Sequence, residues 1–167
     1  ARLLTVNDAK ALTAAAQVPD FDTVFVLVND KQYGGSGGSV IVASLHEASN
    51  EIVLHEAGHS IGKLADEYTT PYPGYPAGDS EPNVTTKTQH DKIKWKNWIE
   101  PDTPLPTEDD SLNTIGLFEG ARYMTKGIYR PKHICKMRSL NQPYCEICTE
   151  ALVLNIYNYV SLFDTYS

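Results

Sequence analysis

The stretch that most constrains this chain is residues 53–68, which contains the pattern His55-Glu56-Ala57-Gly58-His59. On an α-helix, residues four apart differ by only about 40° around the axis, so His55 and His59 project from one face. Two imidazoles placed in this way can hold a single metal ion, and the pattern favours zinc. Glu56 lies about 100° round from His55, where a base for a metal-bound water belongs. The stretch therefore predicts a zinc-binding helix with Glu56 as its catalytic base.

The same helix is expected to carry an apolar arc on its opposite side. A helix that is packed on such an arc presents both histidines together on its other face. Gly62 is expected to end the helix, because glycine is the favoured residue for leaving one. The residues of the predicted arc are Val53, Leu54, Ala57, Ile61 and Leu64.

The third metal ligand depends on how the chain leaves this helix. On an unbroken helix, Asp66 would lie about 10 Å beyond His59 along the axis, too far to share its metal. A turn at Gly62 would bring Asp66 or Glu67 back to the ion. We predict Asp66 as the third ligand, with Glu67 as the alternative. Three protein ligands leave a position open for water, as catalytic zinc requires.

Length and composition indicate one soluble domain. The 167 residues suit a single core, with residues 1–66 as an upper part and residues 67–167 as a lower part. A net charge of −7 argues against nucleic acid or an anionic membrane as the main partner. No apolar run has the length of a membrane span, and no signal peptide is visible. Because the chain begins at Ala1 rather than at methionine, we interpret it as a processed form or an excised fragment.

The first half of the chain has the pattern of an α/β layer. Residues 8–17 predict an alanine-rich helix capped by Asn7 or Asp8. Residues 23–29 form an unbroken β-branched and aromatic run, typical of a strand buried on both faces of a parallel or mixed sheet. Residues 33–38 contain four glycines, which we interpret as a turn or a backbone that must approach something closely. Residues 39–44 predict a second strand.

The second half is largely irregular. Proline-rich loops at 71–82 and 101–110 are expected to form the lower rim of a substrate cleft, with residues 92–99 as a packed short helix or a cleft wall. Residues 116–123 predict a short strand or hairpin, and residues 145–157 a closing helix. The residues expected to point inward at that end are Leu152, Ile156 and Tyr159 or Val160. Candidate ligands for a structural calcium ion are Asp79, Glu81, Asp109 and Asp110, although their spacing matches no known calcium loop.

Several short motifs together resemble a known family. They are Tyr-Gly-Gly-Ser-Gly-Gly at 33–38, His-Glu-Ala-Gly-His-Ser at 55–60, Leu-Ala-Asp-Glu-Tyr at 64–68, Tyr-Arg-Pro at 129–131, Cys-Lys-Met-Arg at 135–138 and Cys-x-x-Cys at 145–148. Across residues 20–155 the chain resembles the metzincin clan and, more narrowly, the bacterial IgA-peptidase family of zinc metallopeptidases. The resemblance implies a metzincin-like α+β fold: a twisted mixed sheet over the active-site helix, and an irregular C-terminal part that ends in a helix.

The resemblance also implies a function and a location. The chain would be a zinc-dependent endopeptidase that hydrolyses extracellular proteins, with Glu56 activating a water on one catalytic zinc. It would be secreted or held at the surface or in the periplasm of a bacterium. The natural substrate and the oligomeric state stay open.

Some site residues follow only from the resemblance. The strand at 39–44 would be an edge strand that pairs with extended substrate, and Met137 would form the methionine turn beneath the zinc. The usual third-ligand position holds Ala65 here, so the turn to Asp66 must differ by one residue. The tyrosine expected two residues after the methionine is replaced by Ser139. The candidates left for stabilising the oxyanion are Tyr123, Tyr129, Arg130 and Arg138.

The three cysteines allow two interpretations. In an exported protein we favour a disulfide from Cys135 to Cys145 or Cys148. Alternatively, these three residues and His133 would form a structural zinc site, and the chain would be a zinc-stabilised binding module without catalytic activity. A further alternative is an inactive peptidase fold that binds a surface, although the intact Glu56 argues against it.

Overall fold

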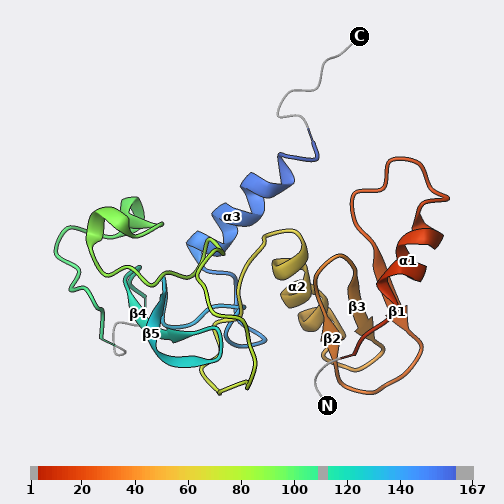
Figure 1. The fold of residues 1–167 in the computed structure, drawn as a ribbon, viewed down its shortest axis with the longest axis horizontal. Coiled ribbons are helices and arrows are strands. Elements are labelled where there is room, and N and C mark those ends of the chain that lie inside the picture. Colours follow the sequence, from red (N-terminus) through yellow and green to blue (C-terminus); the bar gives the residue numbers. More distant parts are fainter. Residues whose placement is uncertain (1–3, 109–112, 161–167) are drawn as a thin grey trace, which may run out of the picture. The chain divides into compact units, whose positions relative to one another are not determined.

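The computed structural model describes residues 4–108 and 113–160. These residues form three α-helices and two small sheets, an α+β arrangement (Figure 1). The chain divides into two compact units, residues 1–62 with 152–167 and residues 63–151. Among the described residues, no helix is long and apolar enough to cross a membrane.

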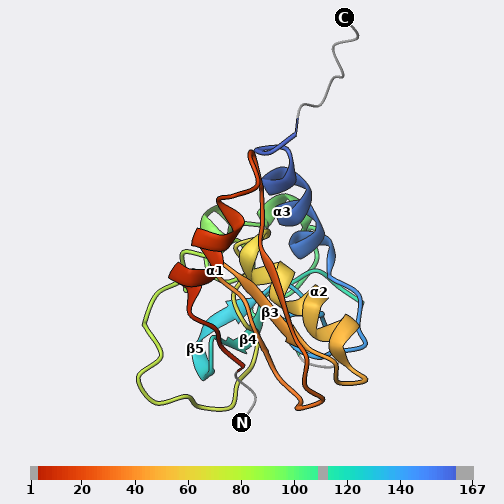
Figure 2. The same cartoon turned by 90° about the vertical axis from the view of Figure 1, so that its right-hand side faces the viewer.

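The first unit is a three-stranded mixed sheet with a helix packed along it. Its strands are β1 (Phe25–Val28), β2 (Gly35–Ser36) and β3 (Ile41–Ser44), in the order β1-β3-β2. Strand β1 runs parallel to β3, and β2 runs antiparallel to it. Helix α1 (Asp8–Ala15) precedes the sheet, and α2 (Ser49–Ser60) lies alongside β3 and β2 (Figure 2). The predicted mixed sheet is confirmed, as is the Asn7 cap, whose Oδ1 accepts from the Lys10 amide at 3.0 Å.

Two predictions about the strands are wrong. Strand β3 is the central, fully buried strand, not an edge strand. Strand β1 is not buried on both faces, because Phe25 is 53% exposed and Leu27 is 63% exposed. Exposed and half-buried residues alternate along β1, which is the pattern of a strand with one covered face.

Helix α2 buries a different face from the one predicted. Its buried residues are Ile52, His55, Gly58 and Ser60, whereas Leu54 of the predicted apolar arc is 46% exposed. The packed face is therefore the one that carries the histidines. The helix ends at Ser60 with Ile61 as its C-cap, close to the predicted end at Gly62. Lys63 then takes a left-handed conformation with φ of 53°, and the chain leaves the helix there.

The second unit is built on a hairpin, β4 (Phe118–Ala121) with β5 (Met124–Arg130), which confirms the predicted strand or hairpin. Ala65, Val84, Ala121 and Ile128 form its apolar core. Two short 3₁₀ helices, His90–Lys92 and Lys96–Trp98, flank the buried Trp95, whose indole donates to the Gly116 carbonyl at 2.7 Å.

Helix α3 (Glu146–Ile156) begins in the second unit and closes the described chain (Figure 1). Its buried residues are Ile147, Cys148 and Ala151, all in its first turns. Leu152 is half-buried, but Ile156, Tyr159 and Val160 are exposed, so the prediction that they point inward is wrong. The helix is packed through its N-terminal half, where the cysteine pair lies.

Candidate metal centre

The two histidines of α2 lie side by side in the first unit. The ring centroids of His55 and His59 are 4.9 Å apart with their planes at 88°, as residues four apart on a helix face should be. His55 is buried and His59 is half-buried. Two imidazoles so placed present nitrogen donors to a common point, which is the chemistry a zinc or similar ion needs.

The glycine-rich loop packs directly against this helix. A Cβ on Gly37 would lie 2.6 Å from the Glu56 carbonyl oxygen and 3.0 Å from both Glu56 Oε2 and His59 Cβ. A Cβ on Gly35 would lie 2.4 Å from Ile52 Cγ2. The Gly38 amide also donates to Ser60 Oγ at 2.9 Å. The predicted close approach is confirmed, and its target is the face of α2 that carries Glu56 and His59.

Asp66 belongs to the second unit, where Tyr123 holds its carboxylate. The Tyr123 hydroxyl donates to Asp66 Oδ2 at 2.5 Å, and the Arg122 amide donates to the Asp66 carbonyl at 2.9 Å. Burial and the adjacent Asp66 raise the pKa of the Tyr123 hydroxyl above its usual range, so it stays a donor. Asp66 itself is buried.

The turn that carries Tyr123 is strained. Arg122 and Tyr123 join β4 to β5 with φ of 49° and 62°, a pair of left-handed residues that normally calls for Asn-Gly. The Arg122 guanidinium ties the turn to the preceding loop through the Glu81 carboxylate and through the Pro76 carbonyl at 2.8 Å. Nothing in local sequence signals this turn, which is why the contact between Tyr123 and Asp66 was missed.

Three tyrosines gather around Tyr123. Its ring centroid lies 5.7 Å from that of Tyr68, 5.6 Å from Tyr72 and 4.6 Å from Tyr75. Tyr72 is exposed and Tyr75 is half-buried. The group places amphipathic rings beside the Asp66 carboxylate.

The other candidates for the oxyanion are engaged with backbone. Arg130 is fully buried and donates from Nη1 to the carbonyls of Glu119 at 2.7 Å and Gly120 at 2.8 Å. Arg138 donates to the Glu67 carbonyl at 3.0 Å. The backbone of Tyr129 exchanges hydrogen bonds with Thr85 at 2.8 and 3.0 Å. These contacts hold the hairpin and the 67–68 segment.

Met137 is fully buried, and its carbonyl accepts a 2.8 Å hydrogen bond from the Glu67 amide. The predicted methionine turn is thus attached to the residue that follows Asp66. Within the second unit, Met137 supports the segment that carries the predicted third ligand.

Glu67 lies with the three cysteines. One carboxylate oxygen of Glu67 and the sulfurs of Cys135, Cys145 and Cys148 all lie within 4.8 Å of one another, and all four residues are buried. The Sγ atoms of Cys135 and Cys148 are 3.5 Å apart, and Cys148 Sγ lies 3.8 Å from Glu67 Oε1. Burial raises the pKa of the Glu67 carboxyl well above its usual range.

This group differs from both interpretations of the cysteines. All three are free thiols in the structure, whereas the sequence favoured a disulfide. The fourth member is Glu67 rather than His133, whose ring packs edge-on against Phe118 with centroids 6.1 Å apart. Glu67 lies some 70 positions before Cys135, and no local signal links the two.

The proposed calcium ligands do not form a cluster among the described residues. Asp79 Oδ2 accepts from the amide and hydroxyl of Thr86 at 2.6 and 2.8 Å, and Glu81 pairs with Arg122. Asp109 and Asp110 lie outside the described residues. Neither of the metal-ligand groups found in the described chain contains Asp79 or Glu81.

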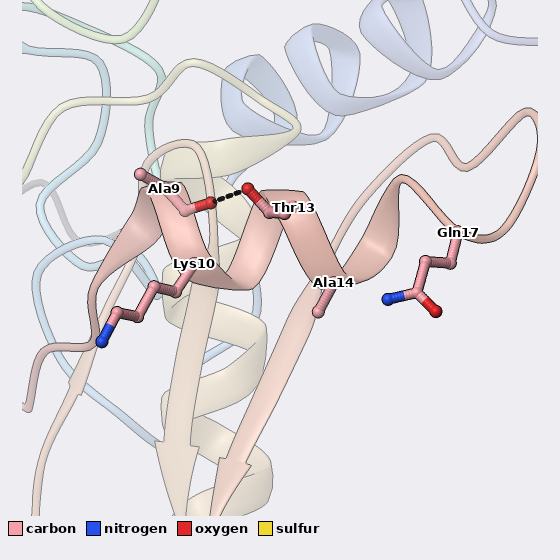
Figure 3. Close-up of a pocket in the computed structure, with 5 residues that line it drawn as sticks. All are labelled: Ala9, Lys10, Thr13, Ala14 and Gln17. Atoms are coloured by element: carbon pink, nitrogen blue, oxygen red, sulfur yellow. Dashed lines mark hydrogen bonds between the residues drawn. The ribbon is translucent and has the colours of Figure 1, made fainter.

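A depression of about 340 Å³ lies along α1 (Figure 3). The residues that line it are Ala9, Lys10, Thr13, Ala14 and Gln17. All are exposed, and the Thr13 hydroxyl is bonded to the Ala9 carbonyl at 2.7 Å. The lining residues include no carboxylate, thiol or imidazole, so we assign no site to this surface.

Comparison with known proteins agrees with the motifs. The family model described as IgA Peptidase M64 matches residues 1–112 and 107–156, nearly the whole chain. No curated protein matches the chain. That family is one of metallopeptidases, so it implies a metal and a protein substrate. The chain belongs to the IgA peptidase M64 family.

Proposed function

We propose that this chain is a zinc-dependent endopeptidase in which His55, His59 and Asp66 hold the zinc and Glu56 is the catalytic base. The observation that carries the proposal is the paired imidazoles, 4.9 Å apart, with Glu56 on the same helix beneath Gly37. Membership of a metallopeptidase family supports it.

The donor set suits a catalytic zinc. Two imidazoles and one carboxylate are a ligand set that catalytic zinc takes, with a position left for water. The Tyr123 hydroxyl on Asp66 has the role of the outer partners that orient metal-bound carboxylates. Asp66 follows His59 by seven residues, after the left-handed Lys63.

Glu67 is the weaker choice for the third ligand. Its carboxylate lies among Cys135, Cys145 and Cys148, and its Oε1 accepts from Asn83 Nδ2 at 3.0 Å. The proposal therefore keeps Asp66 and assigns Glu67 to a different cluster.

In the proposed mechanism, Glu56 is the side chain that carries the proton. When bound, zinc supplies Lewis acidity, which makes a water nucleophilic at neutral pH and polarises the scissile carbonyl. The Glu56 carboxylate accepts the proton of the attacking water and donates it to the leaving amine. The Gly37 backbone lies close to Glu56, and a side chain at this position would meet Glu56 Oε2. Tyr123 is the candidate for stabilising the oxyanion, a role in which its hydroxyl proton would turn from Asp66 to the substrate oxygen.

The substrate is proposed to bind as an extended chain in a metzincin-like manner. Because β3 is central, we assign the pairing edge to the loop that follows β2, beginning at Gly37. Strand β2 itself is not free for pairing, because the Leu4 amide donates to the Gly35 carbonyl and the Ser36 hydroxyl donates to the Leu4 carbonyl. Gly37 and Gly38 then place substrate backbone next to Glu56.

We also propose an extracellular setting. The family description names an immunoglobulin as substrate, and such a protein is met outside the cell. A secreted, cell-surface or periplasmic bacterial enzyme that cleaves extracellular protein fits this description.

The test is the Glu56→Gln variant, assayed on a fluorescently labelled unfolded protein. Gln keeps the shape but cannot accept the proton, so cleavage should fall by about 10²–10⁴-fold while zinc content is unchanged. Glu47→Gln, an exposed residue just before α2, is the matched control and should retain activity. Cleavage by Glu56→Gln at the wild-type rate would refute Glu56 as the base. No cleavage by the zinc-loaded wild-type chain would leave the non-catalytic alternatives, a binding module or an inactive peptidase fold.

A further inference from the structure

Beyond the proposed active site, the second unit contains a buried cluster of four groups that the mechanism does not use. Cys135 begins a turn, since its carbonyl accepts from the amides of Arg138 and Ser139 at 2.9 and 3.0 Å. Cys145 directly precedes α3 and Cys148 lies in its first turn. Two cysteine-bearing turns that face each other are a common way to hold a structural metal. Glu67 completes the group.

The Glu67 carboxylate has an unfilled requirement. Its Oε1 accepts from Asn83 Nδ2, but Oε2 is buried and has no hydrogen-bond partner among the described residues. A buried oxygen left without a partner costs about 1–3 kcal/mol, more when it is charged. The neighbouring thiols do not remove that cost, since thiols are weak donors. A cation bound to the carboxylate would remove it.

We propose that Glu67, Cys135, Cys145 and Cys148 form a second, structural zinc site. A tetrahedral zinc with Zn–S bonds of about 2.3 Å separates its sulfurs by about 3.8 Å, and a sulfur from a carboxylate oxygen by about 3.6 Å. The structure has 3.5 Å between Cys135 Sγ and Cys148 Sγ, and 3.8 Å between Cys148 Sγ and Glu67 Oε1. These two distances thus match a single ion, and all four ligand atoms lie within 4.8 Å of one another.

The same distances are wrong for the other ways of using these cysteines. A disulfide needs its sulfurs about 2.05 Å apart, so forming one here would pull the turns together and leave Glu67 beside a neutral bond. The third cysteine would stay a buried thiol in either pairing. A zinc ion uses all three sulfurs and the carboxylate at once.

The charge of the site can be balanced locally. Zinc with three thiolates and one carboxylate carries a net charge of about −2. Binding releases the three thiol protons, and that of Glu67 where it is protonated, to solvent. The positive charges of Arg130 and Arg138 both favour the ionised form of the Glu67 carboxylate. Arg138 also donates to the Glu67 carbonyl.

The experiment uses the wild-type chain, purified without chelator and loaded with Zn²⁺ or, after exchange, with Co²⁺. We expect about two zinc ions per chain, and cobalt-loaded protein with the near-ultraviolet sulfur-to-cobalt charge-transfer band of a thiolate site. The three cysteines should resist thiol reagents until the chain is unfolded with chelator. A disulfide, seen as one titratable thiol after unfolding under non-reducing conditions, would overturn the site, as would cobalt-loaded protein without a charge-transfer band.

Variants separate this site from the proposed active site. His55→Ala with His59→Ala should leave about one zinc, and the cobalt band should persist. Cys148→Ser should abolish the band and lower the melting temperature, and Glu67→Gln should weaken metal retention at least about tenfold. Ser139→Ala, an exposed neighbour in the same turn, is the control. If wild type holds one zinc that the histidine variant loses, the second site is wrong and the proposed function stands.

Discussion

The Tyr123 hydroxyl donates a 2.5 Å hydrogen bond to Oδ2 of Asp66, from a turn in which Tyr123 and Arg122 both have positive φ. A large residue held in a left-handed conformation costs free energy, of the order of 1–3 kcal/mol. The fold retains this conformation, and the Tyr123 hydroxyl reaches the buried carboxylate that we assign to the catalytic zinc. The strained turn thus holds the Tyr123 hydroxyl where it positions the Asp66 carboxylate.

Tyr123→Phe should weaken zinc binding at the proposed active site. Removal of an outer partner of a metal ligand typically lowers affinity by about 10–100-fold. The measurement is the free zinc concentration that restores half of the cleavage activity after chelation. Tyr72→Phe is the control, since Tyr72 packs near Tyr123 but is exposed. An unchanged zinc requirement with a reduced kcat would instead assign Tyr123 to the oxyanion alone.

Gly37→Ala should damage both stability and activity. The new methyl group would lie 2.6 Å from the Glu56 carbonyl, so the loop or α2 must shift. Overpacking of this kind costs about 1–3 kcal/mol, and a displaced Glu56 loses its geometry. Thermal unfolding and cleavage rates check this. Ser39→Ala, exposed two residues later, should change neither; equal behaviour of the two variants would refute the close approach.

Asp79→Asn should lower stability near neutral pH but not in acid. The amide and hydroxyl of Thr86 bond to the Asp79 carboxylate and lower its pKa. The stabilisation is therefore present above the ordinary carboxyl pKa and is lost as the pH falls through the lowered one. Because Asp79 is largely solvated, we expect a melting-temperature difference of only about 2 °C at pH 7. This difference should vanish near pH 2; a difference of the same size at pH 2 would contradict the role of the ionised carboxylate.

Arg130→Lys should unfold the second unit more readily without a specific effect on catalysis. The buried guanidinium donates hydrogen bonds to two carbonyls of β4, and a lysine cannot reproduce both of them. We expect a loss of about 3 kcal/mol in the free energy of unfolding, measured by denaturant titration. Lys126→Ala, exposed on the same strand, is the control. A stable Arg130→Lys protein with a large drop in kcat would return Arg130 to the oxyanion.

Patterns within one segment were predictable. The spacing of His55 and His59 places both rings on one helix face, and Gly62 marks the end of that helix to within two residues. The glycines at 34–38 signal a close approach, because only glycine leaves room for it. The mixed sheet follows from the two apolar runs.

Long-range placement was not predictable. Strand β3 is central because the short β2, which has almost no strand signal, pairs on its far side. The apolar arc of α2 was assigned from hydrophobicity alone, whereas the glycine loop covers the histidine face. Glu67 meets cysteines from distant turns, and the turn at Arg122-Tyr123 lacks the usual glycine or asparagine. Each depends on contacts between segments that no local pattern encodes.

The most direct test of the proposed active site is a crystal structure of the zinc-loaded chain with a peptide-like inhibitor, with anomalous scattering recorded at the zinc edge. We predict an anomalous peak bonded to His55, His59 and Asp66 at about 2.0–2.2 Å, with Glu56 against the inhibitor. A peak at the histidines completed by Glu67, or no zinc bound to His55 and His59, would contradict the account.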